Sequence, residues 1–250
     1  MTDLLDLTDK VALVTGGSRG LGREMVLAFA QAGADVVIAS RKSRACEELA
    51  LEVEAKTGRK ALSYACHVGH WDQIEGLVEA SYERFGKIDI LVNNAGKSPI
   101  YESLVDVSED LYDKVLAVNL KGPFRLIALV GERMSKGKGG SIINISSVGS
   151  IRPTPEIIPY SAAKAGLNAM TVGFAHAFGP KVRVNCIMCG PFLTDISRAW
   201  DMEVFNERAQ TYALRRGGEP REVVGAALYF ASAASSFCTG AVLRLDGGMP

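Results

Sequence analysis

Two kinds of hydrophobic pattern alternate along the chain. Short runs rich in Val, Ile, Leu and Ala, such as KVALVTGG and ADVVIAS, end in small or polar residues and predict buried strands. Longer segments between them, such as SRACEELALEVEAKTG and WDQIEGLVEASYERFG, carry apolar residues at helical spacing. Strands and helices are therefore expected to alternate from one end of the chain to the other.

The same patterns continue through the rest of the sequence. Further strands are predicted at KALSYACHV, KIDILVNNAG, GSIINISS, KVRVNCIM and GAVLRLDGG. Further helices are predicted over residues 19–32, 108–134 with a bend at Gly122-Pro123, 158–178, 193–212 and 220–234. This order predicts an α/β fold: one Rossmann-like domain over residues 1–250, with a doubly wound parallel sheet and helices on both faces. Ligands of such sheets bind at the carboxyl ends of the strands.

The amino-acid composition excludes several classes of protein. Hydrophobic residues make up 48% of the 250 residues, which excludes a disordered chain. Lys plus Arg and Asp plus Glu balance at 28 each, so the basic excess of a nucleic-acid-binding protein is absent. The segment 223–243 is uncharged and long enough to span a bilayer, but its Ala, Ser and Gly content predicts a buried helix, a turn and a strand. The start MTDLLDLTDK lacks the features of a signal peptide, so we expect a cytoplasmic protein without a membrane segment.

Five cysteines include one CxxC pair, Cys186 and Cys189. A structural zinc site needs four ligands, and no second pair exists. Residues three apart on a strand point to opposite faces. We expect buried thiols and no metal site.

The segment TGGSRGLG, residues 15–22, lies between the first predicted strand and the first helix. Glycines at such a turn let the backbone approach a pyrophosphate, which the helix N-terminus then attracts. At the end of the second strand, Ser40-Arg41 offers no carboxylate for a ribose hydroxyl. Arg41 and Arg19 instead match a 2′-phosphate, which favours NADP over NAD. The alternative is that Arg41 and Lys42 are solvated loop charges.

The segment PYSAAK sets Tyr160 and Lys164 four positions apart, on one face of a predicted helix. A phenol titrates near ~10, and a nearby cation lowers that pKa, so the pair could donate and accept a proton at neutral pH. The alternative is a coincidence on a surface helix.

Two serine-enzyme patterns also occur. Gly16 to Gly20 matches G-x-S-x-G, but several strands precede that elbow in α/β-hydrolases, and no histidine lies near the C-terminus here. Ser161 to Lys164 matches S-x-x-K, but the only KTG lies upstream rather than downstream. Both interpretations are disfavoured.

Five motifs together carry a resemblance. TGGSRGLG, NNAG at 93–96, Asn119 within AVNLKGPF, NISS at 144–147 and YSAAK occur in one order, followed by RRGGEP, TG and DGG. In order and spacing the chain resembles the short-chain dehydrogenase/reductase family over essentially its whole length.

The resemblance implies a set of catalytic residues. Tyr160 is the expected acid/base, and Lys164 would bind the nicotinamide ribose and lower the pKa of the tyrosine. Ser147 would orient the substrate oxygen, and Asn119 would hold a proton-relay water. The residues implied to contact the cofactor are Gly16, Ser18, Arg19, Gly20, Leu21, Gly22, Arg41, His67, Val68, Asn94, Ala95, Gly96, Tyr160, Lys164, Gly190, Phe192 and Thr194, with Asn93 and Ala95 on the adenosine side and Thr194 on the carboxamide.

The chain departs from the family's pattern at two of these positions. Cys189-Gly190 stands where Pro-Gly is usual. His67 stands where an aspartate usually meets the adenine amine. A neutral imidazole can accept one hydrogen bond, so contact with adenine could survive with a different pH dependence.

The expected function is an NADP-dependent oxidoreductase acting on a ketone or secondary alcohol. The alternative is a 3-oxoacyl thioester reductase, with the basic segment 133–138 meeting an acyl carrier protein, or with CoA as the carrier. A non-catalytic cofactor sensor on the same fold is the remaining hypothesis, and the complete set of four catalytic residues argues against it.

Substrate choice is assigned to residues 148–158 and to a lid over 192–212. Apolar residues in the lid favour an apolar or ring-containing substrate: Ile196, Trp200, Met202, Val204 and Phe205. The family resemblance also implies a homotetramer built through the helices that carry Asn119 and Tyr160, and the small apolar run 165–178 is compatible with such an interface.

Overall fold

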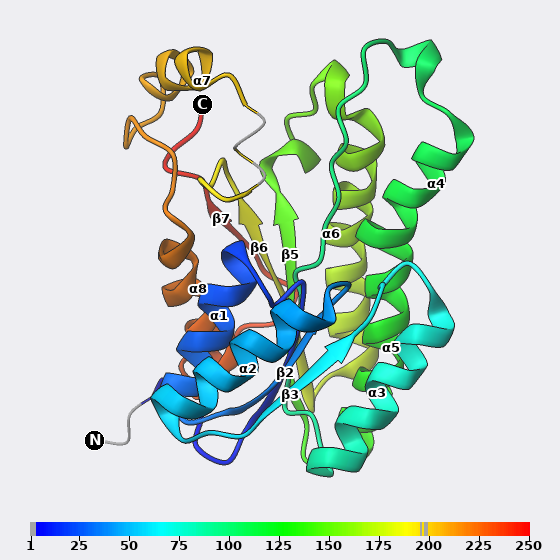
Figure 1. The fold of residues 1–250 in the computed structure, drawn as a ribbon, viewed down its shortest axis with the longest axis vertical. Coiled ribbons are helices and arrows are strands. Elements are labelled where there is room, and N and C mark those ends of the chain that lie inside the picture. Colours follow the sequence, from blue (N-terminus) through cyan, green and yellow to red (C-terminus); the bar gives the residue numbers. More distant parts are fainter. Residues whose placement is uncertain (1–3, 196, 198–199) are drawn as a thin grey trace.

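Seven parallel strands form one sheet at the centre of the molecule (Figure 1). The computed structural model describes residues 4–195, 197 and 200–250. The strand order is β3-β2-β1-β4-β5-β6-β7. The strands are β1 Val11–Thr15, β2 Asp35–Ser40, β3 Ala61–Ala65, β4 Ile90–Asn93, β5 Gly140–Ser147, β6 Val182–Cys189 and β7 Val242–Leu245. The order reverses between β1 and β4, so the switch point at which such sheets bind ligands lies at the ends of these two strands.

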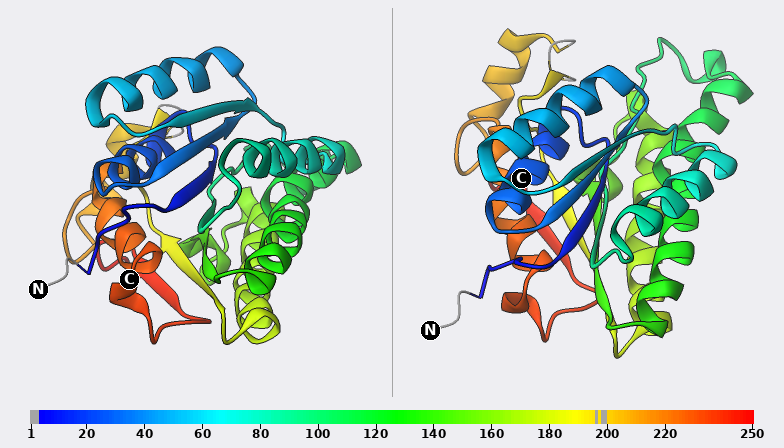
Figure 2. Two further views of the ribbon diagram at one scale, coloured as in Figure 1. Left: turned by 90° about the horizontal axis from the view of Figure 1, so that it is seen from below. Right: turned by 60° about the horizontal axis from the view of Figure 1, so that its bottom comes forward.

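Helices cover both faces of the sheet, as Figure 2 shows. They are α1 Gly20–Gln31, α2 Ser43–Thr57, α3 Trp71–Phe85, α4 Glu109–Leu116, α5 Gly122–Lys136, α6 Ile158–Phe178, α7 Met202–Ala209 and α8 Val224–Ala231. Helices α1, α2 and α8 share one hydrophobic cluster, and α3, α5 and α6 share the other. Along β1, Ala12 and Val14 belong to the first cluster, whereas Val11 and Leu13 belong to the second. Burial on both faces explains why the strands are continuous apolar runs, and it confirms the doubly wound fold.

The predicted helix over 108–134 is interrupted. Helix α4 ends at Leu116, and a π-helical turn, η2 Ala117–Lys121, separates it from α5. The irregularity therefore precedes Gly122-Pro123 instead of lying on it. Pro123 stands in the first turn of α5, where the missing N–H has no helical partner to lose. A Cβ at Gly122 would lie 2.1 Å from the carbonyl oxygen of Val68, so glycine is required for the close approach of this turn to the loop after β3.

The predicted helix over 193–212 was too long. Only α7 Met202–Ala209 forms within it among the described residues, and Ile196 lies outside them. Asp201 starts α7, because its Oδ1 accepts the N–H groups of Glu203 at 3.0 Å and Val204 at 3.2 Å. Before Asp201, the described residues Asp195 and Ser197 have the 3-10 conformation, and the Ser197 N–H donates to the Thr194 carbonyl oxygen at 3.0 Å.

The uncharged segment 223–243 folds as predicted. It holds α8, the short turn η7 Ala233–Ser235 and the start of β7. No helix in the described part of the chain is long and apolar enough to cross a membrane.

The two cysteines of the CxxC pair lie on opposite faces of β6, as predicted. Cys186 Sγ lies 3.5 Å from Asn168 Oδ1 on α6, whereas Cys189 packs in the cluster of α1 and α8. Burial raises the pKa of both thiols, to about 11 for Cys186 and about 12 for Cys189. Both are inert, protonated core residues at neutral pH.

Candidate active site

The glycine turn after β1 forms one wall of the site. Gly16 and Gly20 have φ of +62° and +53°, the left-handed conformation that glycine adopts without strain. A Cβ at Gly22 would lie 2.2 Å from the carbonyl oxygen of Gly16, so the start of α1 packs directly on the turn. Arg19 precedes α1 in an extended conformation, and its side chain makes no capping hydrogen bond. The first-turn N–H groups of α1 are thus open to an anion such as a pyrophosphate.

The loop after β4 is fixed against this turn by side chains. The Thr15 hydroxyl accepts the N–H groups of Asn94 at 3.1 Å and Ala95 at 3.2 Å. Asn94 Nδ2 donates to the carbonyl oxygens of Thr15 at 2.9 Å and Gly16 at 3.0 Å. The two loops at the switch point are therefore one rigid unit, and Thr15 contributes to it although no role was predicted for this residue from the sequence.

Positive charge gathers at the ends of β2 and β3. Ser18 Oγ donates to Ser40 Oγ at 2.9 Å, which links the glycine turn to the end of β2. Arg41 follows Ser40 and is exposed. The pKa of His67 is lowered first by burial and then by the nearby charges of His70, Arg41 and Lys97. Arg19 lies 3.9 Å from Asp195, an exposed ion pair that contributes little to stability.

Ser147, Tyr160 and Lys164 come together between β5 and α6. Ser147 ends β5, and Tyr160 and Lys164 lie one turn apart on α6. Lys164 is buried, its Nζ donates to the carbonyl oxygen of Ile145 at 2.7 Å, and it lies 5.7 Å from the centre of the Tyr160 ring.

The electrostatics of this pair differ from the sequence prediction. Burial raises the pKa of Tyr160 to about 12, against a smaller lowering by its hydrogen bond with Ser147. Burial also lowers the pKa of Lys164 to about 8, because the surrounding β5 and α6 residues exclude water from the ammonium. In this arrangement the pKa of Tyr160 is raised, not lowered as predicted, and a backbone carbonyl holds the Lys164 ammonium. The phenol is protonated at neutral pH, which suits proton donation.

Asn119 is fully buried in the π-helical turn. Its Nδ2 donates to the carbonyl oxygens of Lys97 at 2.8 Å and Val115 at 2.9 Å, and its Oδ1 accepts the Lys97 N–H at 3.3 Å. A Cβ at Gly96 would lie 3.3 Å from Asn119 Oδ1 and 3.9 Å from Lys164 Nζ. Gly96 thus leaves a cradle beside both side chains, and a π-turn at this place is typical of a functional site.

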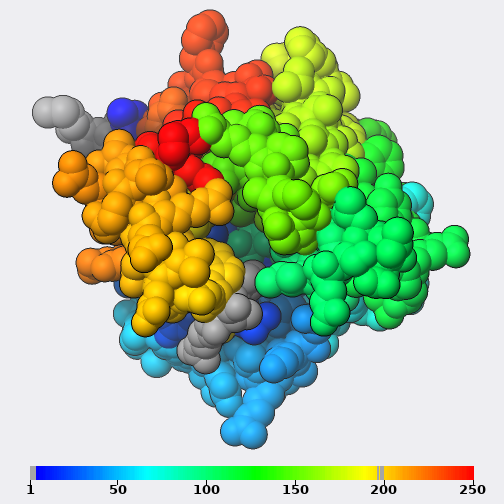
Figure 3. All heavy atoms as spheres, turned by 90° about the horizontal axis from the view of Figure 1, so that it is seen from above, coloured from blue at the N-terminus to red at the C-terminus, as the bar shows by residue number. Residues whose placement is uncertain are grey.

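The segment after β6 forms another wall of the site. A Cβ at Gly190 would lie 2.6 Å from Asp246 Cα, so the chain ends of β6 and β7 touch here. Phe192 pairs with Gly218 in a parallel bridge. Thr194 lies against the glycine turn, because a Cβ at Gly20 would be 3.5 Å from its Cγ2. Seen from above in Figure 3, the segments around residues 205, 150 and 105 surround a hollow over the ends of the strands.

Val68 and Leu21, two of the implied cofactor contacts, pack their side chains against the core. Val68 is 6% exposed and packs in the cluster of α3 and α5, and Leu21 packs partly buried on the other cluster. Both positions can offer only their backbone or a small part of a side chain to a ligand.

Tyr101 is a site residue that was not predicted from the sequence. Its hydroxyl donates to the carbonyl oxygen of Pro155 at 2.6 Å and accepts the Ile158 N–H at 2.9 Å. It therefore ties the loop after β4 to the start of α6, two residues before Tyr160. No motif surrounds Tyr101 in the sequence, so only the structure could identify it.

The geometry fits a dinucleotide with a 2′-phosphate or 2′-hydroxyl. The open N-terminus of α1, the positive end of β2 and the cradle at Gly96 lie along one edge of the sheet, where pyrophosphate, adenosine and nicotinamide would each find a place. Across the described ranges, no group of three or more His, Cys, Asp or Glu could hold a metal ion.

Comparisons with known proteins agree with this geometry. A family model described as Enoyl-(Acyl carrier protein) reductase matches residues 16–250. "Dehydrogenase/reductase SDR family member 4" of Pongo abelii is 36% identical over 253 residues, which cover 100% of this chain and 91% of the relative.

Two solved structures superpose on nearly the whole chain. A 7 alpha-hydroxysteroid dehydrogenase complexed with NADH and 7-oxo glycochenodeoxycholic acid has a TM-score of 0.95 and 30% identity, covering 100% of this chain and 97% of that one. An NADPH-dependent 3-quinuclidinone reductase from Rhodotorula rubra has a TM-score of 0.92 and 29% identity, covering 98% of this chain and 93% of that one. The chain belongs to the short-chain dehydrogenase/reductase family, whose members use nicotinamide cofactors, and it is an oxidoreductase of CH–OH and C=O groups.

Proposed function

We propose that the protein is an NADP-dependent carbonyl reductase in which Tyr160 donates the proton to the substrate oxygen. The observation that carries this proposal is the convergence of Ser147, Tyr160 and Lys164 beside the Gly96 cradle at the switch point of the sheet. When bound, the nicotinamide cofactor supplies or accepts the hydride. Ser147 and Tyr160 orient the carbonyl oxygen, and the protonated phenol neutralises the alkoxide that develops on it.

Lys164 and Asn119 hold the cofactor side of the site. The Lys164 ammonium, fixed by the Ile145 carbonyl, would meet the nicotinamide ribose. The amide of Asn119 fixes the π-turn and Lys97 in place, and the family resemblance assigns the relay water to this residue. Gly190, Phe192 and Thr194 would cover the nicotinamide, and residues 192–212 would form the lid.

The preference for NADP rests on charge at the adenosine end. Arg41 is exposed beside His67, Lys97 contributes to the same positive field, and residues 41–46, directly after β2, include no carboxylate. Arg19, at the start of α1, would add a second guanidinium. A 2′-phosphate is attracted by this arrangement, whereas a 2′-hydroxyl gains little from it.

The 3-oxoacyl thioester reductase is the second candidate, since the description of the matching family model names the acyl carrier protein. The basic segment at the end of α5 gives it limited support. Arg133 pairs with Glu79, and Lys136 pairs with Glu132 at 2.8 Å, so part of its charge is neutralised within the chain.

The test of function is NADPH consumption on a short 3-oxoacyl thioester and on a panel of cyclic and aromatic ketones. The variant Tyr160→Phe keeps the ring but removes the proton, so kcat should fall by about 10²- to 10⁴-fold while NADPH still binds. The best substrate decides between the two candidates. Binding of NADPH without turnover of any substrate would favour the sensor hypothesis instead.

The test of cofactor choice is Arg41→Ala. Loss of a charge-assisted hydrogen bond to phosphate should raise KM for NADPH by about tenfold or more, with KM for NADH nearly unchanged. Lys42→Ala is the matched control on the next residue. Equal effects on NADPH and NADH would contradict the role of Arg41.

A further inference from the structure

His67 lies at the carboxyl edge of the sheet, after β3 and beside the end of β2. It is half-buried, and the nearby positive charges of Arg41 and Lys97 contribute to the lowering of its pKa. In the nucleotide site proposed above, on which this inference rests, the family resemblance places the nucleobase at this position. What the imidazole can recognise there depends on which nitrogen carries the proton.

The structure fixes the proton by a backbone contact. The Gly69 N–H donates to His67 Nδ1 at 3.1 Å. A ring nitrogen that accepts a hydrogen bond carries no proton, so the proton of the neutral ring is on Nε2. A Cβ at Gly69 would lie 2.9 Å from His67 Cε1 and 3.0 Å from Nδ1, so a glycine at this position is what permits the contact.

The surrounding loop holds the ring in this orientation. The His67 N–H donates to Gln73 Oε1 at 2.8 Å, and the His67 carbonyl oxygen accepts the His70 N–H at 3.0 Å. The His70 ring packs against the His67 ring with centroids 4.7 Å apart. Nδ1 is thus already used, and the expectation that the imidazole accepts a hydrogen bond from adenine is wrong at that nitrogen.

Nε2 remains a hydrogen-bond donor whether the imidazole is neutral or protonated. Burial lowers the pKa of His67 below its usual 6.5, and the charges of His70 on the same loop, Arg41 after β2 and Lys97 after β4 act in the same direction. The ring is therefore neutral above pH 7. Below its pKa the added proton goes to Nδ1, and Nε2 remains a donor.

We propose that His67 presents the Nε2–H donor to the nucleobase, so that this site selects an acceptor atom of the purine instead of its 6-amino group. A carboxylate at this position would accept from the 6-amino group of adenine and repel the 6-oxo group of hypoxanthine. A fixed donor can serve a ring nitrogen of adenine or the 6-oxo group of hypoxanthine. The protein therefore accepts dinucleotides of either base.

The experiment compares the binding of NADPH and its hypoxanthine counterpart, reduced nicotinamide hypoxanthine dinucleotide phosphate, by calorimetric titration without substrate. The two Kd values of the wild-type protein should agree within about threefold, and His67→Asp should favour the adenine form by about tenfold or more. Both ligands carry the same phosphates, so the repulsion between these phosphates and the carboxylate that His67→Asp introduces cancels in the ratio. For His67→Asn, whose amide can turn to donate or accept, the ratio should stay near that of the wild type.

Two further readouts do not depend on that variant. The ¹⁵N resonances of the His67 imidazole in the free protein at pH 8 should show Nδ1 unprotonated and Nε2 protonated. The wild-type ratio of Kd values should also be equal at pH 6 and pH 8, because an accepting nitrogen would lose its bond on protonation whereas Nε2–H would not.

The outcomes separate this inference from the proposed function. A wild-type preference of tenfold or more for the adenine form, or a proton on Nδ1 at pH 8, would overturn the inference and leave the reductase proposal intact. Failure of both dinucleotides and of NADH to bind would overturn the nucleotide site itself and this inference with it.

Discussion

In the role proposed for it, Lys164 would serve the reaction at the expense of stability. It is 3% exposed, and its ammonium donates to the Ile145 carbonyl at 2.7 Å. Burial lowers the pKa of Lys164 from 10.5 to about 8, so the folded state binds a proton less readily than the unfolded state. The charged lysine therefore destabilises the cofactor-free protein at neutral pH.

We expect Lys164→Met to raise the free energy of unfolding at pH 7 by about 1 to 2 kcal/mol, after the lost hydrogen bond is set against the removed charge. The destabilisation by Lys164 is complete below pH 8 and declines as the pH rises from 8 toward 10.5, where the folded lysine is already neutral. The advantage of the variant should thus fall by more than half at pH 9.5. Urea unfolding at both pH values measures it, and a variant that is less stable by the same amount at pH 7 and 9.5 would contradict the argument.

At the scale of elements, the site depends on how the start of α6 is attached. Tyr101, in the loop after β4, donates to Pro155 and accepts from Ile158, so one hydroxyl fixes the turn from which Tyr160 projects. The first turn of α6 has no side-chain cap of its own, which makes this outside contact important for the position of the helix.

Tyr101→Phe should lower kcat by about tenfold with a smaller change in KM, since two hydrogen bonds of about 1 kcal/mol each no longer hold the helix start. The pH profile of kcat should keep its shape, because the residue positions Tyr160 without exchanging protons. Tyr112→Phe, on the exposed side of α4, is the matched control. Unchanged kcat in Tyr101→Phe would show that α6 is positioned by its packing alone.

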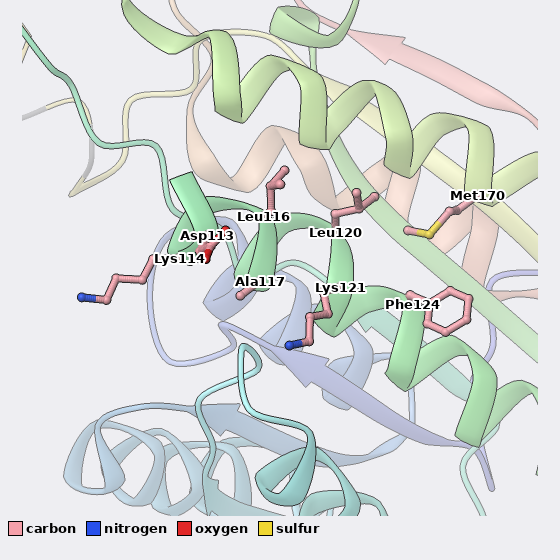
Figure 4. A pocket seen from close by; sticks show the side chains of 8 residues that line it. All are labelled: Asp113, Lys114, Leu116, Ala117, Leu120, Lys121, Phe124 and Met170. Carbon is pink, nitrogen blue, oxygen red and sulfur yellow. The ribbon is translucent and has the colours of Figure 1, made fainter. Parts of the chain in front are cut away.

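At the scale of the whole molecule, a large hollow of the described surface lies away from the strand ends. It measures about 700 Å³ and is lined by residues of α4, the π-turn, α5 and α6: Asp113, Lys114, Leu116, Ala117, Leu120, Lys121, Phe124 and Met170. In Figure 4, Leu116 and Leu120 extend toward the helix that carries Met170. On the neighbouring face of α6 most exposed residues are small or apolar, among them Ala165, Ala169 and Val172. This surface is where we propose that a homotetramer assembles.

Phe124→Asp should break that assembly, because Phe124 is 43% exposed and a charge there would be buried against a second copy. Sedimentation should show a smaller species than the wild type at the same concentration. Leu51→Asp on α2, an exposed apolar residue on the other face of the sheet, should leave the assembly unchanged. A tetrameric Phe124→Asp protein would move the interface to another surface.

The sequence by itself determined the order of elements and the residue types at each strand end. Alternate burial of β1 on two faces makes its run apolar throughout, and the Gly, Asn, Ser and Tyr-Lys motifs sit where strands meet loops, so local pattern and position along the chain were sufficient. The same local pattern could not locate the break at Ala117–Lys121, because the break accompanies the packing of Gly122 on Val68 in the folded chain. The start of α7 differs: the cap by Asp201 is a local signal that the sequence contains and that the longer predicted helix overlooked.

Only the tertiary structure decided the chemical state of the site. The pKa values of Tyr160 and Lys164 follow from burial between β5 and α6, and the carbonyl that holds Lys164 is far from it in the sequence. The proton on His67 follows from one backbone N–H two residues away, which the sequence contains but whose direction it does not reveal. Motif spacing in the sequence identifies which side chains could react. Their protonation states depend on the exclusion of water and on the direction of hydrogen bonds, and both are set by the folded surroundings.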